Sequence, residues 1–153
     1  MKKEKELAET QHLFDLQASK RYQDIHLGEF IEKLIVGLQP AASQQNNFFV
    51  NEVLPGIVVT TNENLLAAVI TDLLIVVINR NKNSSIRISA KNFSNLVLLH
   101  INEQYSKMTK KPLSDFNNLQ PLAAKLGGCI TVSGHEESSD TLAFSFLDFI
   151  HLV

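Results

Sequence analysis

Apolar residues recur at helical spacing in four stretches of the chain, which predict helices over residues 4–22, 27–38, 63–79 and 114–126. Pro40 follows the second stretch and predicts its end. Asn62 stands directly before the third stretch, where its side chain suits an N-cap. The third stretch is apolar nearly all round, so we expect it to be buried on most sides. Gly127 and Gly128 follow the fourth, which suits a left-handed C-terminal cap.

Alternating or continuous apolar runs between these helices predict six strands, over residues 48–53, 57–61, 85–91, 96–103, 129–133 and 141–149. Pro55 and Gly56 form the turn between the first two strands. Residues 85–91 and 96–103 are expected to pair as a hairpin, and residues 134–140 form the turn before the last strand. The order of elements predicts a mixed sheet with helices on one face, a two-layer α/β (α+β) sandwich.

Composition is that of one ordinary folded domain. The 153 residues are 44% hydrophobic and 20% charged, and the formal net charge is −2, so a nucleic-acid partner is not expected. Neither an apolar run long enough to span a bilayer nor a secretory signal is recognisable, which predicts a cytoplasmic protein that does not insert into a membrane. Cys129 is the only cysteine. It excludes an internal disulfide, and its place in a strand predicts a buried small side chain.

Several phrases, in this order, resemble the catalytic and ATP-binding domain of sensor histidine kinases, a GHKL or Bergerat-type ATPase fold. They include Leu38-Gln39-Pro40-Ala41-Ala42, Leu54-Pro55-Gly56-Ile57 and Leu126-Gly127-Gly128-Cys129-Ile130-Thr131-Val132. The likeness covers roughly residues 13–147. It implies two parts: residues 1–24 resemble the end of the family's dimerisation hairpin, and residues 25–153 resemble its ATPase domain.

The resemblance also implies where a nucleotide would bind, and there the sequence departs from the family. Matching Asp72-Leu73-Leu74 to the family's Asn-Leu-Leu phrase puts Val76 where an asparagine normally coordinates Mg²⁺. Mg²⁺ needs hard oxygen ligands, which an isopropyl group does not offer, and a shift of one residue gives only Ile75. Asp72 and Asn79 are the nearby side chains that keep an oxygen.

The adenine end of the implied site departs in the same way. Glu103, or Asn102 beside it, is the residue that could replace the family's adenine-binding aspartate. The glycines that normally follow are missing, and no glycine occurs between Gly56 and Gly127, although a phosphate-binding lid needs backbone that side chains do not obstruct. Asp72, Asn79 and Glu103 are therefore predicted to be a vestigial ATP site, and residues 103–114 are short for a lid.

The resulting prediction is a degenerate histidine-kinase-like domain that acts as a non-catalytic module in two-component signalling. It has no expected catalytic residue, metal or cofactor; its partners are a response-regulator receiver or a kinase, and helix 4–22 could form a homodimer. The phosphoacceptor is also missing, because His12 is followed by Leu13 and not by an acidic residue. The alternative is a divergent but active domain that binds ATP with Mg²⁺ through Asp72 or Asn79. An anti-sigma-type partner binder shares the fold, but it also normally uses nucleotide.

Overall fold

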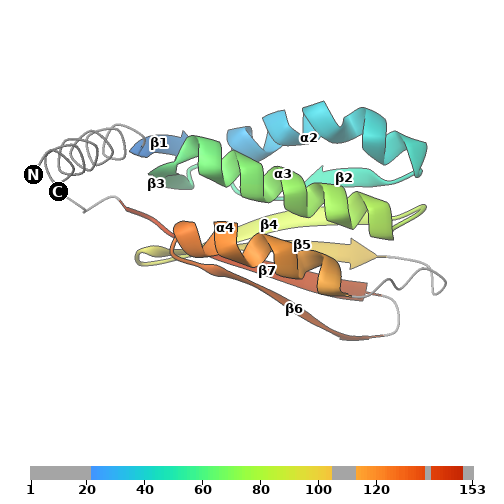
Figure 1. The fold of residues 1–153 in the computed structure, drawn as a ribbon. Helices are drawn as coiled ribbons and strands as arrows, with labels where there is room; N and C mark the ends of the chain where they lie inside the picture. The colour runs from blue at the N-terminus through green and yellow to red at the C-terminus, as the bar shows by residue number, and fades with distance from the viewer. Residues whose placement is uncertain (1–21, 105–112, 137–138, 150–153) are drawn as a thin grey trace, which may run out of the picture.

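The computed structural model describes residues 22–104, 113–136 and 139–149. These residues form two layers, with helices above a sheet, and both ends of the described chain lie at the same end of the molecule (Figure 1). The predicted two-layer α/β sandwich is confirmed. Among the described residues, no helix is long and apolar enough to cross a membrane.

The main sheet has five strands in the order β2-β4-β5-β7-β6. Their bounds are Phe48–Asn51 (β2), Ser85–Phe93 (β4), Leu96–Gln104 (β5), Ser139–Leu147 (β7) and Cys129–Glu136 (β6). β2 pairs with β4 in parallel, and all other neighbours are antiparallel, including the predicted β4–β5 hairpin. The sheet is therefore mixed, as expected. β6 ends three residues later than predicted and β7 begins two residues earlier, so the turn between them is shorter than residues 134–140; β7 also ends at Leu147, two residues before the predicted end.

A second, two-stranded sheet joins β1 (Tyr22–His26) to β3 (Val58–Asn62). The pattern of apolar residues in the sequence did not predict β1, because only Ile25 of its five residues is buried and the other four carry polar groups. The predicted helix over residues 4–22 lies outside the described residues, except that Tyr22 begins this strand. β2 and β3, the runs on either side of Pro55 and Gly56, do not pair with each other but belong to different sheets.

Helix α2 (Leu27–Gln44) continues through Pro40, so the prediction that Pro40 marks its end is wrong. A proline inside a helix removes one backbone hydrogen bond, which leaves the carbonyl of residue 36 without its usual donor. Val36 and Pro40 both lie on the exposed side of α2, where water can hydrogen-bond to that carbonyl. The turn after Pro40 is held because Ala42 is completely buried and its carbonyl accepts a bond from the Asn47 amide.

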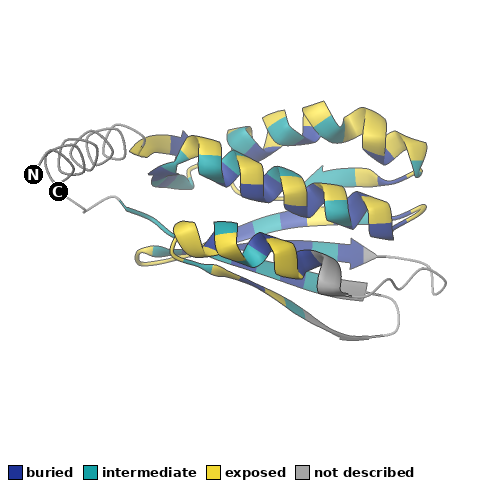
Figure 2. Cartoon of the chain, viewed as in Figure 1, coloured by how far each residue is buried: buried dark blue, intermediate teal, exposed yellow. Residues whose placement is uncertain are grey.

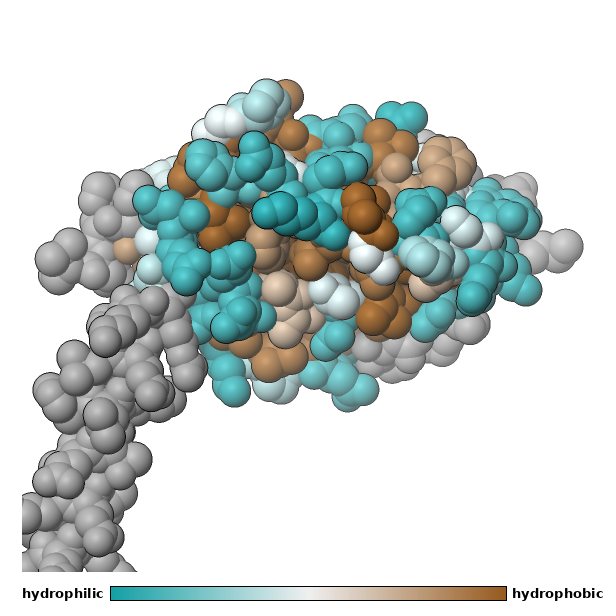
Figure 3. All heavy atoms as spheres, turned by 90° about the horizontal axis from the view of Figure 1, so that it is seen from above, coloured by the Kyte–Doolittle hydropathy of each residue, from teal (hydrophilic) through white to brown (hydrophobic). Residues whose placement is uncertain are grey.

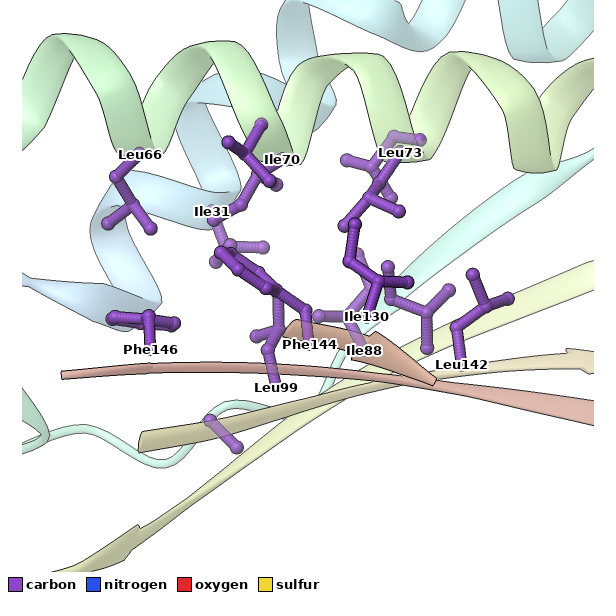
Figure 4. Close-up of a cluster of buried hydrophobic side chains, with 14 of the residues drawn as sticks. Ile31, Leu66, Ile70, Leu73, Ile88, Leu99, Ile130, Leu142, Phe144 and Phe146 are labelled. Carbon is purple, nitrogen blue, oxygen red and sulfur yellow. The ribbon is translucent and has the colours of Figure 1, made fainter. Parts of the chain in front are cut away.

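Helix α3 (Glu63–Arg80) lies beside α2 in the helical layer and supplies much of the core. The predicted cap is confirmed: the Asn62 side chain accepts a hydrogen bond from the Leu65 amide at 3.0 Å. Eight of its residues are buried, but an exposed strip runs along its outer side (Figure 2). Below it, leucines and isoleucines of α3 meet the phenylalanines of β7, Phe144 and Phe146, in the core between the layers (Figure 4).

The predicted helix over residues 114–126 is divided into a 3-10 turn, η1 (Leu113–Leu119), and a short helix, α4 (Gln120–Lys125). Gly127 follows with φ of +75°, so the predicted left-handed end is confirmed. Gly128 is required for a different reason. A Cβ atom there would lie 1.5 Å from the carbonyl oxygen of Ser145, so only glycine lets the chain enter β6 this close to β7.

Candidate functional site

Helix α3 carries two of the three predicted site residues on its outer side. Asp72 and Asn79 are both exposed, and their spacing of seven residues puts them on the same helix face. Val76, at the position of the expected metal ligand, is partly buried and packs against the hydrophobic core. The structure thus places Asp72 and Asn79 on one face of α3, about 10 Å apart along the helix axis, and on the side away from the core.

Glu103, the third predicted site residue, lies on the opposite side of α3, inside the protein. Alternation along β5 turns Leu99, Ile101 and Glu103 toward the helices, and Glu103 is 0% exposed. Its Oε1 atom lies 3.7 Å from Nε of Arg80, whose side chain is 2% exposed. Glu103 therefore belongs to a buried ion pair and is not a carboxylate at the surface of the site.

Arg80 was not among the residues predicted from the sequence to belong to the site. It is the last residue of α3, and its guanidinium carbon also lies 5.2 Å from the ring centre of Phe116 in η1, which is within reach of a cation–π contact. Arg80 follows the buried Leu73 and Val77 at spacings of seven and three residues. That spacing was the available signal, since it predicts an arginine on the buried face of the helix.

Asn102, the alternative to Glu103, lies on the other face of the sheet. It is only partly buried, and its amide donates a hydrogen bond to the Thr141 hydroxyl at 3.0 Å in the neighbouring strand β7. Because adjacent residues of a strand point to opposite faces, Asn102 cannot act together with the side chains above the sheet. The candidate site on the helix side therefore includes Glu103 and excludes Asn102.

The Arg80–Glu103–Phe116 cluster joins three elements that lie far apart in the sequence: the end of α3, the end of β5 and η1. A carboxylate and a guanidinium neutralise each other there, and the aromatic ring covers the guanidinium. Removing two charges from water costs several kcal/mol each unless they remain paired. The arrangement can therefore hold these three elements together.

Other polar groups do not gather into a second chemical site within the described chain. No group of three or more His, Cys, Asp or Glu side chains there could hold a metal ion. His26 is exposed and lines an open hollow of about 300 Å³ at the start of α2, with Glu29, Glu32 and Asn51 among its other walls. Cys129 is exposed, so the prediction of a buried cysteine is wrong; it lies on the face of β6 that no helix covers.

The sequence matches no protein-family model and no curated protein, but solved structures share its fold. The Acinetobacter baumannii histidine kinase AdeS superposes with a TM-score of 0.70 at 15% identity, over 83% of this chain and 67% of that chain. The catalytic domain of histidine kinase ThkA, in a nucleotide-free form, gives 0.69 at 15% identity, over 83% of this chain and 97% of that domain.

A longer ThkA chain was solved in complex with the response regulator protein TrrA. It gives a TM-score of 0.68 at 16% identity and covers 96% of this chain, which spans 49% of that ThkA chain. At identities this low, the superposition establishes a shared fold, and it carries no information on whether the chemistry is shared. The chain therefore has the fold of the histidine kinase catalytic domains.

Proposed function

We propose that this chain is a non-catalytic signalling module of the two-component type, which keeps the histidine kinase fold without binding nucleotide. The observation that carries the proposal is the buried Arg80–Glu103–Phe116 cluster. It occupies the place where the resemblance to the family would require an adenine-binding carboxylate that a ligand can reach.

Glu103 is a poor acceptor for an adenine amino group because Arg80 already neutralises it and no solvent reaches it. A base could reach this carboxylate only after the guanidinium moved away. Separating the partners of a buried ion pair costs roughly 3–5 kcal/mol, which would weaken nucleotide binding by a factor of about 10² to 10³ or more. The closed pair therefore opposes binding of a base.

The metal end of the implied site is equally unfavourable. Val76 packs against the core and offers no oxygen, while Mg²⁺ is held by carboxylates, carbonyls, phosphates and water in near-octahedral geometry. Asp72 is exposed one turn earlier on α3, and a single solvated carboxylate binds Mg²⁺ only weakly. The residues present do not fit a Mg²⁺–nucleotide complex, so we derive no phosphoryl-transfer step from them.

A response-regulator receiver domain is the partner that we propose for the module. ThkA, which has the same fold, was solved together with the response regulator TrrA, so a domain of this shape can be part of such a complex. A module that binds a receiver without phosphorylating it would compete with the receiver's own kinase. A kinase partner and a homodimer through residues 4–22 remain the other proposals from the sequence, and a cytoplasmic location is the compartment that we propose.

One observation favours the alternative of a divergent ATP-binding domain that uses Mg²⁺. Asp72 and Asn79 lie on one face of α3 and are both exposed, so one or the other could offer an oxygen to a metal bound above that helix; at about 1.5 Å of rise per residue they are too far apart to hold the same ion. This arrangement would need a nucleotide to approach from the outer side of α3, away from Glu103. The two functions therefore differ in whether Mg²⁺ and nucleotide bind, and in which residues the binding requires.

The test is calorimetric titration of ATP and ADP, with and without Mg²⁺, into the full chain. We expect no heat of binding up to about millimolar nucleotide, which corresponds to less than about 4 kcal/mol of binding free energy. Mg²⁺-dependent binding in the micromolar range would overturn the proposal. The variant Asp72→Ala should then abolish that binding, whereas the matched control Glu63→Ala, at another exposed acidic residue of α3, should not.

The partner is tested separately, by titrating purified receiver domains into the chain and following the heat or a receiver-borne fluorophore. Binding without transfer of phosphate from ATP supports the module that we propose. Phosphate transfer from ATP to the receiver or to a histidine of the chain would show a working kinase instead.

A further inference from the structure

The two edges of the five-stranded sheet are the places where another chain could add a strand. On the helical side of the molecule, apolar and polar residues are intermixed (Figure 3). A sheet edge instead presents a row of backbone N–H and C=O groups, which can pair with any extended segment. The edges of this sheet are β2 and β6.

The β2 edge is short and is held against α2. β2 has four residues. The side-chain amide of Asn51, the last of them, donates to the carbonyl of Gly28 at 3.0 Å and to the carboxylate of Glu32 at 3.1 Å. Short edge strands and charged side chains beside them are common ways of keeping another strand away, so β2 is a poor template for a further strand.

The first half of β6 lacks such protection in its own sequence. Cys129-Ile130-Thr131-Val132 contains neither a charged residue nor a proline, and three of its four residues are β-branched. Uncharged segments with high β propensity pair readily with copies of themselves. The second half of β6 is irregular, with a shift of register between Ser133 and Glu136, and such irregularities discourage pairing at an edge. The vulnerable part of the edge is therefore Cys129–Val132.

The side chain of Gln120 closes this part of the edge. Gln120 is the first residue of α4, which packs on β6 and β7 (Figure 1). Its Nε2 atom donates to the carbonyl of Ile130 at 2.6 Å, and its Oε1 atom accepts from the amide of Ile130 at 3.0 Å. Both backbone groups of Ile130 are thus bonded, as they would be by a neighbouring strand.

These two bonds lie on the outer side of β6. On the inner side, the Cys129 amide donates to the hydroxyl of Ser145 in β7 at 3.2 Å, and that hydroxyl lies 3.3 Å from the Cys129 carbonyl. The backbone groups of successive residues in a strand point to opposite sides. Ile130 and Val132 therefore point away from β7, and the Gln120 amide occupies the place of a further strand.

We propose that Gln120 is a guard that prevents a second copy of the chain from adding its own β6 to this edge. In an antiparallel pair of two β6 strands centred on Thr131, Ile130 of each copy would exchange both backbone bonds with Val132 of the other. Each of these pairs needs the N–H and C=O groups of an Ile130. Gln120 therefore blocks the whole pairing from a single position, although the uncharged segments themselves would not repel each other.

The test is sedimentation equilibrium of the full chain and of Gln120→Ala over a concentration series. Association through residues 1–21 would be common to both proteins, so the comparison isolates the edge. We expect the apparent dissociation constant of Gln120→Ala to be at least tenfold lower. Its melting temperature should fall by only a few degrees, because water can bond to Ile130 at an edge. Equal association of the two proteins would overturn the proposal.

Val132→Pro separates an open edge from a general loss of stability. Because the Val132 N–H points outward, a proline there removes a donor that the added strand needs and leaves the bonds to β7 in place. Gln120→Ala combined with Val132→Pro should associate no more than the unaltered chain. The matched control is Gln44→Ala, which removes an exposed amide at the end of α2 and should change nothing. Association that persists in the double variant would place the contact elsewhere and refute the guard.

Hydrogen exchange gives a second readout that does not require the proline variant to fold. In the unaltered chain, the Ile130 amide should exchange at least tenfold more slowly than the Val132 amide, because it is bonded to Gln120. In Gln120→Ala at low concentration this protection should disappear. At high concentration both amides should become protected together. An Ile130 amide that exchanges at the same rate with and without the Gln120 side chain would also overturn the proposal.

Discussion

The Nε atom of Arg80 lies 3.7 Å from the Oε1 atom of Glu103, and neither side chain is more than 2% exposed. The two residues are 23 positions apart in the sequence, on the last turn of a helix and near the end of a strand. Their ion pair therefore fixes α3 against β5 at the end of the molecule where the implied nucleotide site would open.

Removal of either partner should be strongly destabilising, whereas removal of both should not be. We expect Arg80→Met and Glu103→Leu each to lower the free energy of unfolding by about 3–5 kcal/mol, because each leaves a buried charge behind. The double variant should recover most of that loss, since apolar side chains replace both charges. Urea unfolding of the four proteins measures this double-mutant cycle. Additive losses in the double variant would contradict a paired cluster.

Restoring an oxygen at the expected metal position should not restore nucleotide binding. In Val76→Asn the amide returns to the position of the family's metal ligand, but Glu103 remains closed by Arg80. We expect no Mg²⁺-dependent binding of ATP in the calorimeter and a loss of about 1–2 kcal/mol of stability, because Val76 is partly buried. Val76→Ala controls for the lost packing. Micromolar binding by the asparagine variant would show that the base end of the site is open.

The buried side chain of Asn47 should be a sensitive position for stability. Its amide donates to the carbonyls of Ile78 and Asn81 at 3.1 and 3.0 Å, and its Oδ1 accepts from the Ser84 amide at 3.1 Å. Asn47→Ala leaves these backbone groups buried without that partner, which we expect to cost about 2–3 kcal/mol in urea unfolding. Gln44→Ala, exposed at the end of α2, should change stability by less than about 0.5 kcal/mol.

Two glycines should respond in opposite directions to the same substitution. Gly37 lies within α2 with no atom within 4 Å of the place where a Cβ would be, so Gly37→Ala should stabilise the protein by about 0.5–1 kcal/mol. Gly128→Ala would bring a Cβ against the Ser145 carbonyl and should cost more than about 4 kcal/mol or prevent folding. Thermal unfolding measures both. A tolerated Gly128→Ala would mean that the junction between α4 and β6 can move.

The ring of Phe149 should hold the start of the described chain in place. It stacks on Tyr22 with 4.9 Å between ring centres, and Asp148 beside it accepts a hydrogen bond from the Thr60 amide of β3 at 2.8 Å. We expect Phe149→Ala to lose about 1–2 kcal/mol and to speed hydrogen exchange at the β1 amides more than in the five-stranded sheet. Tyr22→Phe keeps both rings and should exchange at the original rate.

The sequence was informative wherever one local signal decided the structure. Asn62 capped α3 as its position predicted, Gly127 ended α4 in the left-handed region, and the alternation in β4 and β5 gave their hairpin. The pattern failed where tertiary contacts decided instead. α2 runs through Pro40 because the buried Ala42 holds the next turn, and the polar β1 exists because β3 pairs with it.

The candidate site was predicted only in part for the same reason. Helical spacing placed Asp72 and Asn79 together on α3, and strand alternation could have separated Asn102 from Glu103. The partner of Glu103 could not be found along the strand, because Arg80 belongs to a helix and Phe116 to a turn much later in the chain. That Asp72, Asn79 and Glu103 are a vestigial ATP site stays a prediction.

The stack of Tyr22 on Phe149 also has a consequence for protein engineering. It brings the entry and exit points of the described domain together, so that a host protein could carry the whole domain within one surface loop without being pulled apart. A circular permutant with a short linker from residue 149 to residue 22 should fold for the same reason. New ends at the exposed β4–β5 turn, near Ser94, would then leave every strand of the sheet intact.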